Sequence, residues 1–387
     1  MSIFYTYFKG QTPETRFFAI RFLSEFSDNK HVQLSVLELS RRLAVSKNTV
    51  TTGMAWMVTK ECLEPCLKSQ FGRRHPNKYK IMENSRELQE VIEKEFRASP
   101  HEGAIRLLVS PRLNDQLQLL PSEMVDKLQL ANLLFMAMLF LLADSTGVAW
   151  GLSQKTIREL TGMSNNRIRS QLDTLRKYGF LEHVYSGGSG KVLFGLESSI
   201  FYIRREYCPL SRSAWKGRNV EVCLKKFFAF MKAIVTQLSA PSQKNKDALL
   251  LMGFGVEIGE ALEKFSKLLH FKANDWEMAH LEQIHDRWAA RVLTEHFESA
   301  FPPRAAQMPD WLTGEIQQTL FPRTLLGSYK VKQGPNPLSD NELEMISSYI
   351  AKSVVEHAND LILVIDNPTH NLFRIESSSR DRKLFYC

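Results

Sequence analysis

The sequence predicts a mainly α-helical chain with small β-hairpins, and two observations lead to this fold class. Two stretches, 34–81 and 152–203, each contain two short helical patterns followed by two strand-like runs around a polar loop. From residue 207 to the C-terminus, helical patterns predominate. With 387 residues, the chain is long enough for two or three domains of ordinary size.

The stretch 152–203 shows the pattern most clearly. Ile157 and Leu160 have the spacing of one short helix, and Gly162 ends it, because glycine adopts a positive φ at little cost. Ser164 is a good N-cap for a second helix. The apolar residues of that helix recur at helical spacing: Ile168, Leu172 and Leu175.

A β-hairpin is expected after the second helix. The runs Phe180 to Tyr185 and Lys191 to Leu196 are strand-like, and the loop between them is rich in glycine. With this order of helix, turn, helix and hairpin, the sequence resembles the winged helix-turn-helix regulators of bacteria, phages and plasmids. The residues that carry the resemblance are Ser164, Ile168, Leu172, Leu175, Gly179, Phe180 and Leu181.

The resemblance implies a DNA-binding role for the second helix of the motif. In such proteins this helix enters the major groove, and its N-terminal side chains contact base edges. The exposed positions that correspond are Asn165, Asn166, Arg167, Arg169 and Ser170. Asparagine can form two hydrogen bonds with adenine, and arginine can form two with guanine. The alternative is a small helical domain that contacts proteins.

A looser copy of the motif lies in the stretch 34–81. Ser46 is the expected N-cap of its second helix, and the apolar residues Val50, Met54 and Met57 repeat the spacing above. Gly53 departs from the pattern, because glycine inside a helix costs about 1 kcal/mol relative to alanine. The candidate DNA-binding residues of this helix are Lys47, Asn48, Thr51 and Thr52. A repeat of about 118 residues, measured from Ser46 to Ser164, indicates a duplicated domain.

The two hairpins differ in charge. The first has a basic tip, and its candidate DNA-binding residues are Arg73, Arg74, Lys78 and Lys80. Such side chains can follow the phosphate backbone and supply sequence-independent affinity, although a charge run is also typical of a solvated surface. The second hairpin has only Lys191 near its tip, while its glycines would allow close approach to DNA or to a partner.

Four segments are expected in total. Residues 1–83 and 127–206 form two winged helix-turn-helix domains, 84–126 a structured connector, and 207–387 an α-helical C-terminal domain that ends in a β-hairpin. Within them we predict a helix over 86–96, a short strand over 105–109, a buried helix over 128–143, and hairpin strands over 361–365 and 372–375.

The sequence gives little support for catalysis or metal binding. Cys62, Cys66 and His75 fall short of the four ligands of a structural zinc site. The helix with His280, Glu282, His285 and His296 lacks the spacing of zinc proteases, so these residues are predicted to lie at the surface. Asp366 and Glu376 resemble a metal-dependent nuclease core only faintly. We therefore expect no enzyme activity, no cofactor and no metal.

Charge and composition complete the prediction. The net charge of +8 and the pI of about 9.1 favour a polyanionic partner. The longest apolar run, 133–143, is shorter than the roughly 20 residues that span a bilayer, and no signal-peptide pattern is found. Five cysteines imply no disulfide framework. We expect a cytoplasmic, nucleoid-associated protein without membrane contact that binds specific double-stranded DNA.

The expected role is transcriptional regulation, with a homodimer formed through the C-terminal helices. One alternative is a replication initiator or a maintenance protein of a plasmid, phage or other mobile element, because initiators of this kind also carry two winged helices in one chain. A nuclease or recombinase is a further alternative.

Overall fold

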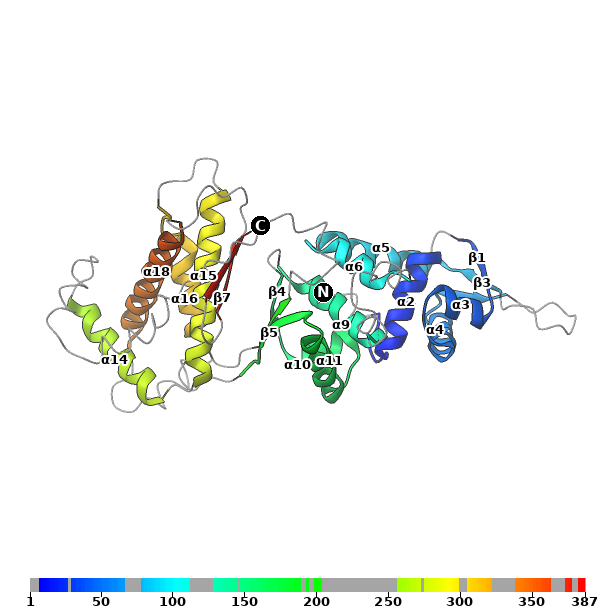
Figure 1. Ribbon diagram of the computed structural model, residues 1–387, viewed down its shortest axis with the longest axis horizontal. Helices are drawn as coiled ribbons and strands as arrows, with labels where there is room; N and C mark the ends of the chain where they lie inside the picture. Colours follow the sequence, from blue (N-terminus) through cyan, green and yellow to red (C-terminus); the bar gives the residue numbers. More distant parts are fainter. Residues whose placement is uncertain are drawn as a thin grey trace, which may run out of the picture. The chain divides into compact units, whose positions relative to one another are not determined.

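The structure is a computed structural model, in which the chain divides into two compact units. It describes residues 7–26, 29–66, 78–111, 128–144, 147–188, 193–194, 198–203, 256–272, 275–298, 305–321, 338–362, 373–377 and 382–386. Unit 1 comprises residues 1–186 and 198–216, and unit 2 comprises residues 187–197 and 217–387. Both are mainly helical with small antiparallel sheets, as predicted (Figure 1).

Unit 1 contains the same order of elements twice. The first half consists of α2 (Pro13–Phe26), β1 (His31–Gln33), α3 (Val36–Arg42), α4 (Lys47–Thr59), β2 (Leu63–Pro65) and β3 (Lys78–Ile81). The second half consists of α9 (Leu130–Leu142), β4 (Val148–Leu152), α10 (Gln154–Thr161), α11 (Asn165–Lys177), β5 (Leu181–Tyr185) and β6 (Ser199–Ile203). The strand orders, β1-β3-β2 and β4-β6-β5, correspond as well, so the two halves share one topology. Strands β1 and β4 are absent from the sequence prediction.

One hydrophobic core extends through both halves of unit 1. Helix α2 packs against α4 of its own half and against α9 of the other half. Every residue of α9 from Ala131 to Phe140 is buried, which confirms the prediction of a buried helix there. The buried residues of this core run from Phe8 to Ile203.

The connector between the halves is part of the same core. It contains α5 (Glu83–Ala98), somewhat longer than predicted, and α6 (Glu102–Val109). The predicted strand over 105–109 is wrong. Ile105, Leu108 and Val109 have helical spacing, and this spacing lets α6 bury one side, where it packs against α9. The Ser99 hydroxyl also donates to the Phe140 carbonyl oxygen, at 3.1 Å.

Unit 2 is a helical bundle with a hairpin. Its helices are α14 (Val256–Lys272), α15 (Asp275–Glu298), α16 (Asp310–Leu320) and α18 (Asp340–Ile362), and α18 packs against the other three. The predicted C-terminal hairpin exists but is displaced along the chain. Leu361 belongs to α18 and is buried in the bundle, while the paired strands are β7 (Phe373–Ser377) and β8 (Arg382–Tyr386). None of the helices in the described ranges combines the length and apolarity needed to cross a membrane.

Candidate nucleic-acid interface

In the first helix pair, α3 and α4, local hydrogen bonds cap the beginning of each helix. Ser35 caps α3, with Glu38 completing a capping box. Ser46 caps α4 as predicted, because its side chain accepts from the Thr49 N–H at 3.1 Å. Between the two helices, Ala44 adopts a positive φ of 49°, which takes the place of the glycine in the second pair.

Helix α4 has one buried side and one exposed side. Val50, Met54 and Met57 are buried in the core, as their spacing predicts. The four candidate DNA-binding residues of this helix are all exposed: Lys47, Asn48, Thr51 and Thr52. Their side chains are therefore available to a ligand from solvent.

The second helix pair, α10 and α11, follows the prediction closely. Gly162 ends α10 in the left-handed conformation, with a φ of 73°. Ser164 caps α11, and its hydroxyl accepts from the Arg167 N–H at 3.4 Å. Ile168 and Leu175 are buried, whereas Leu172 is half-buried. In the view of Figure 1, α4 and α11 both lie along the lower side of unit 1.

The candidate residues of α11 fall into two groups. Asn165, Asn166, Arg169 and Ser170 are exposed. Arg167 is only partly exposed, because its guanidinium forms a bidentate ion pair with the Glu14 carboxylate of α2. No local sequence pattern predicts this ion pair, since Glu14 lies 153 positions away in the chain.

The first hairpin is described only at its base. Lys78 and Lys80 are exposed on β3, and Lys80 Nζ lies 3.5 Å from a carboxylate oxygen of Glu64. Arg73 and Arg74 lie outside the described residues. The basic tip therefore stays a prediction.

The second hairpin differs from the prediction. Lys191 lies outside the described residues, but Leu193 and Phe194 are buried in the core of unit 2. The Leu193 N–H donates to the Glu277 carboxylate at 2.8 Å, and the Phe194 ring packs edge-on against His280. Phe194 also has a φ of 67°, which a β-strand does not allow. The predicted strand over 191–196 is therefore wrong at these residues, and Ser199–Ile203 pairs with β5 instead.

Two buried arginines of α2 join the helix pairs to the rest of unit 1. The Arg21 guanidinium donates to the carbonyl oxygens of Leu43 and Ala44, at the end of α3, and to those of Val109 and Ser110. The Arg16 guanidinium donates to the carbonyl oxygens of Glu159 and Leu160, both at 2.6 Å, near the end of α10. A cation suits this position, because carbonyl groups at a helix C-terminus carry partial negative charge.

No sequence pattern identified these two arginines as functional or structural residues. Burial lowers the pKa of Arg16 and of Arg21 to about 10, so both remain charged at neutral pH. A buried charge is tolerated only where hydrogen bonds compensate for lost hydration. Here backbone carbonyls of both helix pairs supply those bonds.

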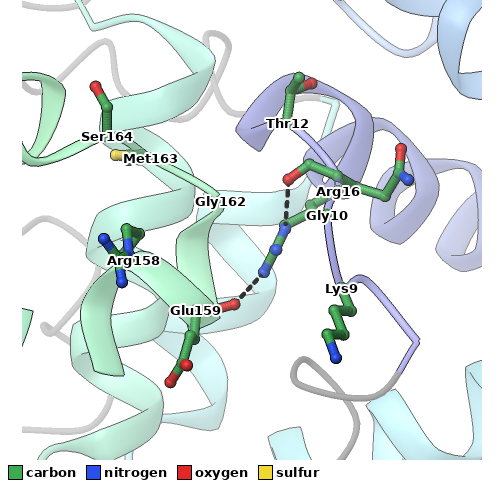
Figure 2. Close-up of a pocket in the computed structure, with 10 residues that line it drawn as sticks. Lys9, Gly10, Thr12, Arg16, Arg158, Glu159, Gly162, Met163 and Ser164 are labelled. Carbon is green, nitrogen blue, oxygen red and sulfur yellow. Dashed lines mark hydrogen bonds between the residues drawn. The ribbon is translucent and has the colours of Figure 1, made fainter. Parts of the chain in front are cut away.

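A pocket of about 490 Å³ adjoins the turn of the second helix pair (Figure 2). It lies between the loop that precedes α2 and the end of α10. The side chains and backbone that line it come from Lys9, Gly10, Gln11, Thr12, Arg16, Arg158, Glu159, Gly162, Met163 and Ser164.

The histidines of α15 are buried, which corrects the prediction of surface residues. His280, His285 and His296 face the interior of the bundle, and burial lowers the pKa of His280 to about 4. His285 Nε2 lies 2.8 Å from the Ser353 hydroxyl oxygen of α18. This contact joins α15 to α18. Within the described residues, no group of three or more His, Cys, Asp or Glu side chains has the arrangement of a metal site.

Unit 1 thus contains two capped helices, α4 and α11, with exposed polar side chains in their first turns. These side chains can form hydrogen bonds with the polar groups of a ligand. Comparison with known proteins adds no further assignment: no protein-family model, curated protein or solved structure matches the chain.

Proposed function

We propose that this protein binds a specific sequence of double-stranded DNA and regulates transcription. The observation that carries the proposal is the repeated topology of unit 1. Each half has the element order of a winged helix-turn-helix, and the second helix of each pair buries its apolar side while leaving polar N-terminal residues exposed. In that fold, these residues are the ones that contact base edges.

The shared core supports binding of both halves to one duplex. Because α2 packs on α4 and α9, the spacing between the two helix pairs is set by the protein rather than by a flexible linker. A second contact made by the same rigid body is intramolecular, and such tethering can raise affinity by about 10²–10⁴. A homodimer through the helices of unit 2 would double the DNA site into two related halves.

A replication initiator is the second candidate, and the same observation favours it. Fixed spacing between two DNA-binding helices suits repeated sites of constant length, such as those expected at an origin. The positions that the protein occupies in its genome distinguish the two roles. Scattered promoter sites would support a regulator, whereas clustered repeats would support an initiator.

The first test is selection of bound fragments from random duplex DNA by the full-length protein. We expect an enriched motif longer than one major-groove contact. For that motif, Arg169→Ala should reduce affinity by about 1–3 kcal/mol and relax the preference at one base pair if Arg169 contacts a base. Lys177→Ala is the matched control, because Lys177 is exposed in the last turn of the same helix. If no motif is enriched, the proposal fails.

A further inference from the structure

The pocket beside the second helix pair has a strongly basic lining. Lys9 comes from the loop before α2, Arg158 from α10, and Arg16 from α2, whereas Glu159 is the acidic residue of the lining. Figure 2 shows Lys9 and Arg158 on opposite sides, with the Arg16 guanidinium between them. Three cations against one carboxylate leave an excess of positive charge.

The charge of Arg16 is hydrogen-bonded but not neutralised. Its guanidinium donates to the carbonyl oxygens of Gln11, Glu159 and Leu160, which carry no formal charge. Its side chain is only 2% exposed, so bulk water screens it poorly. An anion entering the pocket would meet this positive field at short range.

The shape of the pocket also admits a ligand close to the backbone. Gly10 has a φ of 78°, and a Cβ added to it would meet no described atom within 4 Å. By contrast, a Cβ on Gly162 would overlap the Gln11 carbonyl oxygen, so the loop before α2 and the end of α10 are in close contact at this point. The volume of about 490 Å³ lies in the range of small-molecule sites.

We propose that this pocket binds a phosphate-bearing anion through the exposed side chains of Lys9 and Arg158, with the buried charge of Arg16 behind them. Two sources share that chemistry: a free phosphorylated small molecule, and a phosphate of the DNA backbone. Only the second source rests on the proposed function. Because the pocket includes Ser164, the N-cap of α11, an occupant of either kind lies directly beside the helix that carries Asn165 and Asn166.

The free-anion arm of the test is calorimetric titration of the full-length protein with pyrophosphate at low salt. Loss of a charge-assisted hydrogen bond weakens binding by about tenfold or more, so the double variant Lys9→Ala, Arg158→Ala should bind pyrophosphate at least about tenfold more weakly. Lys155→Ala is the matched control, because Lys155 is exposed on α10 but does not line the pocket. Its affinity should equal that of the unaltered protein.

The DNA arm uses the duplex selected above. If a backbone phosphate fills the pocket, pyrophosphate should compete with DNA, and the double variant should lower the slope of log affinity against log salt by one to two, which the control should not. Binding of pyrophosphate without such competition would identify a free effector. Pyrophosphate binding without any DNA binding would support the pocket while refuting the proposed function. If pyrophosphate does not bind and the DNA affinity and salt slope of the double variant equal those of the control, the pocket proposal is overturned.

Discussion

At the scale of single residues, the ion pair between Glu14 and Arg167 bears most directly on DNA binding. Arg167 stands at the third position of α11, where a side chain can reach a base or a phosphate. In the structure its guanidinium is held by the Glu14 carboxylate, and about a third of each side chain is exposed. If the protein binds DNA as proposed, Glu14 would compete with DNA for Arg167.

Replacing Glu14 with glutamine should increase affinity for DNA. The substitution keeps the shape of the side chain but removes the charge that holds Arg167. Partly exposed ion pairs are worth about 0.2–1 kcal/mol, so we expect an increase of up to roughly fivefold in a mobility-shift titration. Asp173→Asn is the control, because it removes an exposed negative charge from α11 itself. Equal effects of the two substitutions would mean that only net charge matters.

The Glu14–Arg167 ion pair should depend on pH, because it needs the Glu14 carboxylate in its charged form. Burial raises the pKa of Glu14, but the hydrogen bond and charge of Arg167, together with hydrogen bonds from the Glu14 backbone and Thr12, outweigh it, so the pKa lies below the ordinary value of 4.5. A lowered pKa in the folded state means that the ion pair stabilises the protein at neutral pH and is lost as the pH falls through that lowered value. Carboxyl chemical shifts of Glu14, followed by NMR, should therefore titrate below pH 4.5. In Arg167→Ala the midpoint should rise, and an unchanged midpoint would contradict the assignment.

Gly53 lies inside α4 although glycine weakens a helix, because the ring of Phe18 leaves no space for a side chain there. A Cβ at this position would overlap the ring of Phe18 on α2. Gly53→Ala should therefore destabilise the protein by about 1–3 kcal/mol, despite the better helix propensity of alanine. Denaturant unfolding measures this change. Ala55→Gly, at an exposed position of the same helix, is the control for propensity and should cost about 1 kcal/mol. A stabilised Gly53→Ala protein would show that α2 and α4 are not packed this closely.

At the scale of elements, helices were predictable where a cap and an apolar spacing coincide. Ser46 and Ser164 are N-caps in the structure, and Gly162 ends α10 as its left-handed preference indicates. These signals are local, so the sequence contains them. The partner of Arg167 and two of the acceptors of Arg16, the carbonyl oxygens of Glu159 and Leu160, lie more than 140 positions away, and no local pattern identifies them.

The prediction of the second strand of the second hairpin was wrong for a related reason. Leu193 and Phe194 have the apolar character of a buried strand, and they are indeed buried, but in the bundle of unit 2 rather than in a sheet. An apolar run shows that a segment is covered without showing what covers it. Strand β6, which pairs with β5 and β4, lies a few residues further along.

The basic residues of the first hairpin should make the affinity for DNA depend on salt concentration. Lys78 and Lys80 are exposed on β3, and Arg73 and Arg74 precede them in the sequence. Neutralising all four should weaken binding to specific and to random duplexes alike, and should reduce the slope of log affinity against log salt by roughly one for each lost phosphate contact. Neutralising Arg97 and Lys94, on α5, provides a charge control. An unchanged slope would indicate a solvated charged loop.

At the scale of the whole molecule, α2 links the two helix pairs and so determines whether they unfold together. Arg21 reaches the end of α3, and Arg16 reaches the end of α10, so one helix holds the first helix of each pair. Two separate domains on a connector would move independently. Because the two halves share one core and these contacts, they should instead unfold together as a single cooperative unit.

Arg16→Met in the full chain tests this cooperativity. The substitution keeps an apolar stem but leaves the carbonyl oxygens of Glu159 and Leu160 without the guanidinium. An unsatisfied buried acceptor costs about 1–3 kcal/mol, so the loss should be a few kcal/mol. Amide hydrogen exchange should then rise in α11, near the substitution, and equally in α4, whose contact with α2 is unaltered. Lys155→Met, exposed on α10, should change neither helix. Faster exchange confined to the second half would mean that the halves unfold separately, and the fixed spacing on which binding to one duplex depends would be lost.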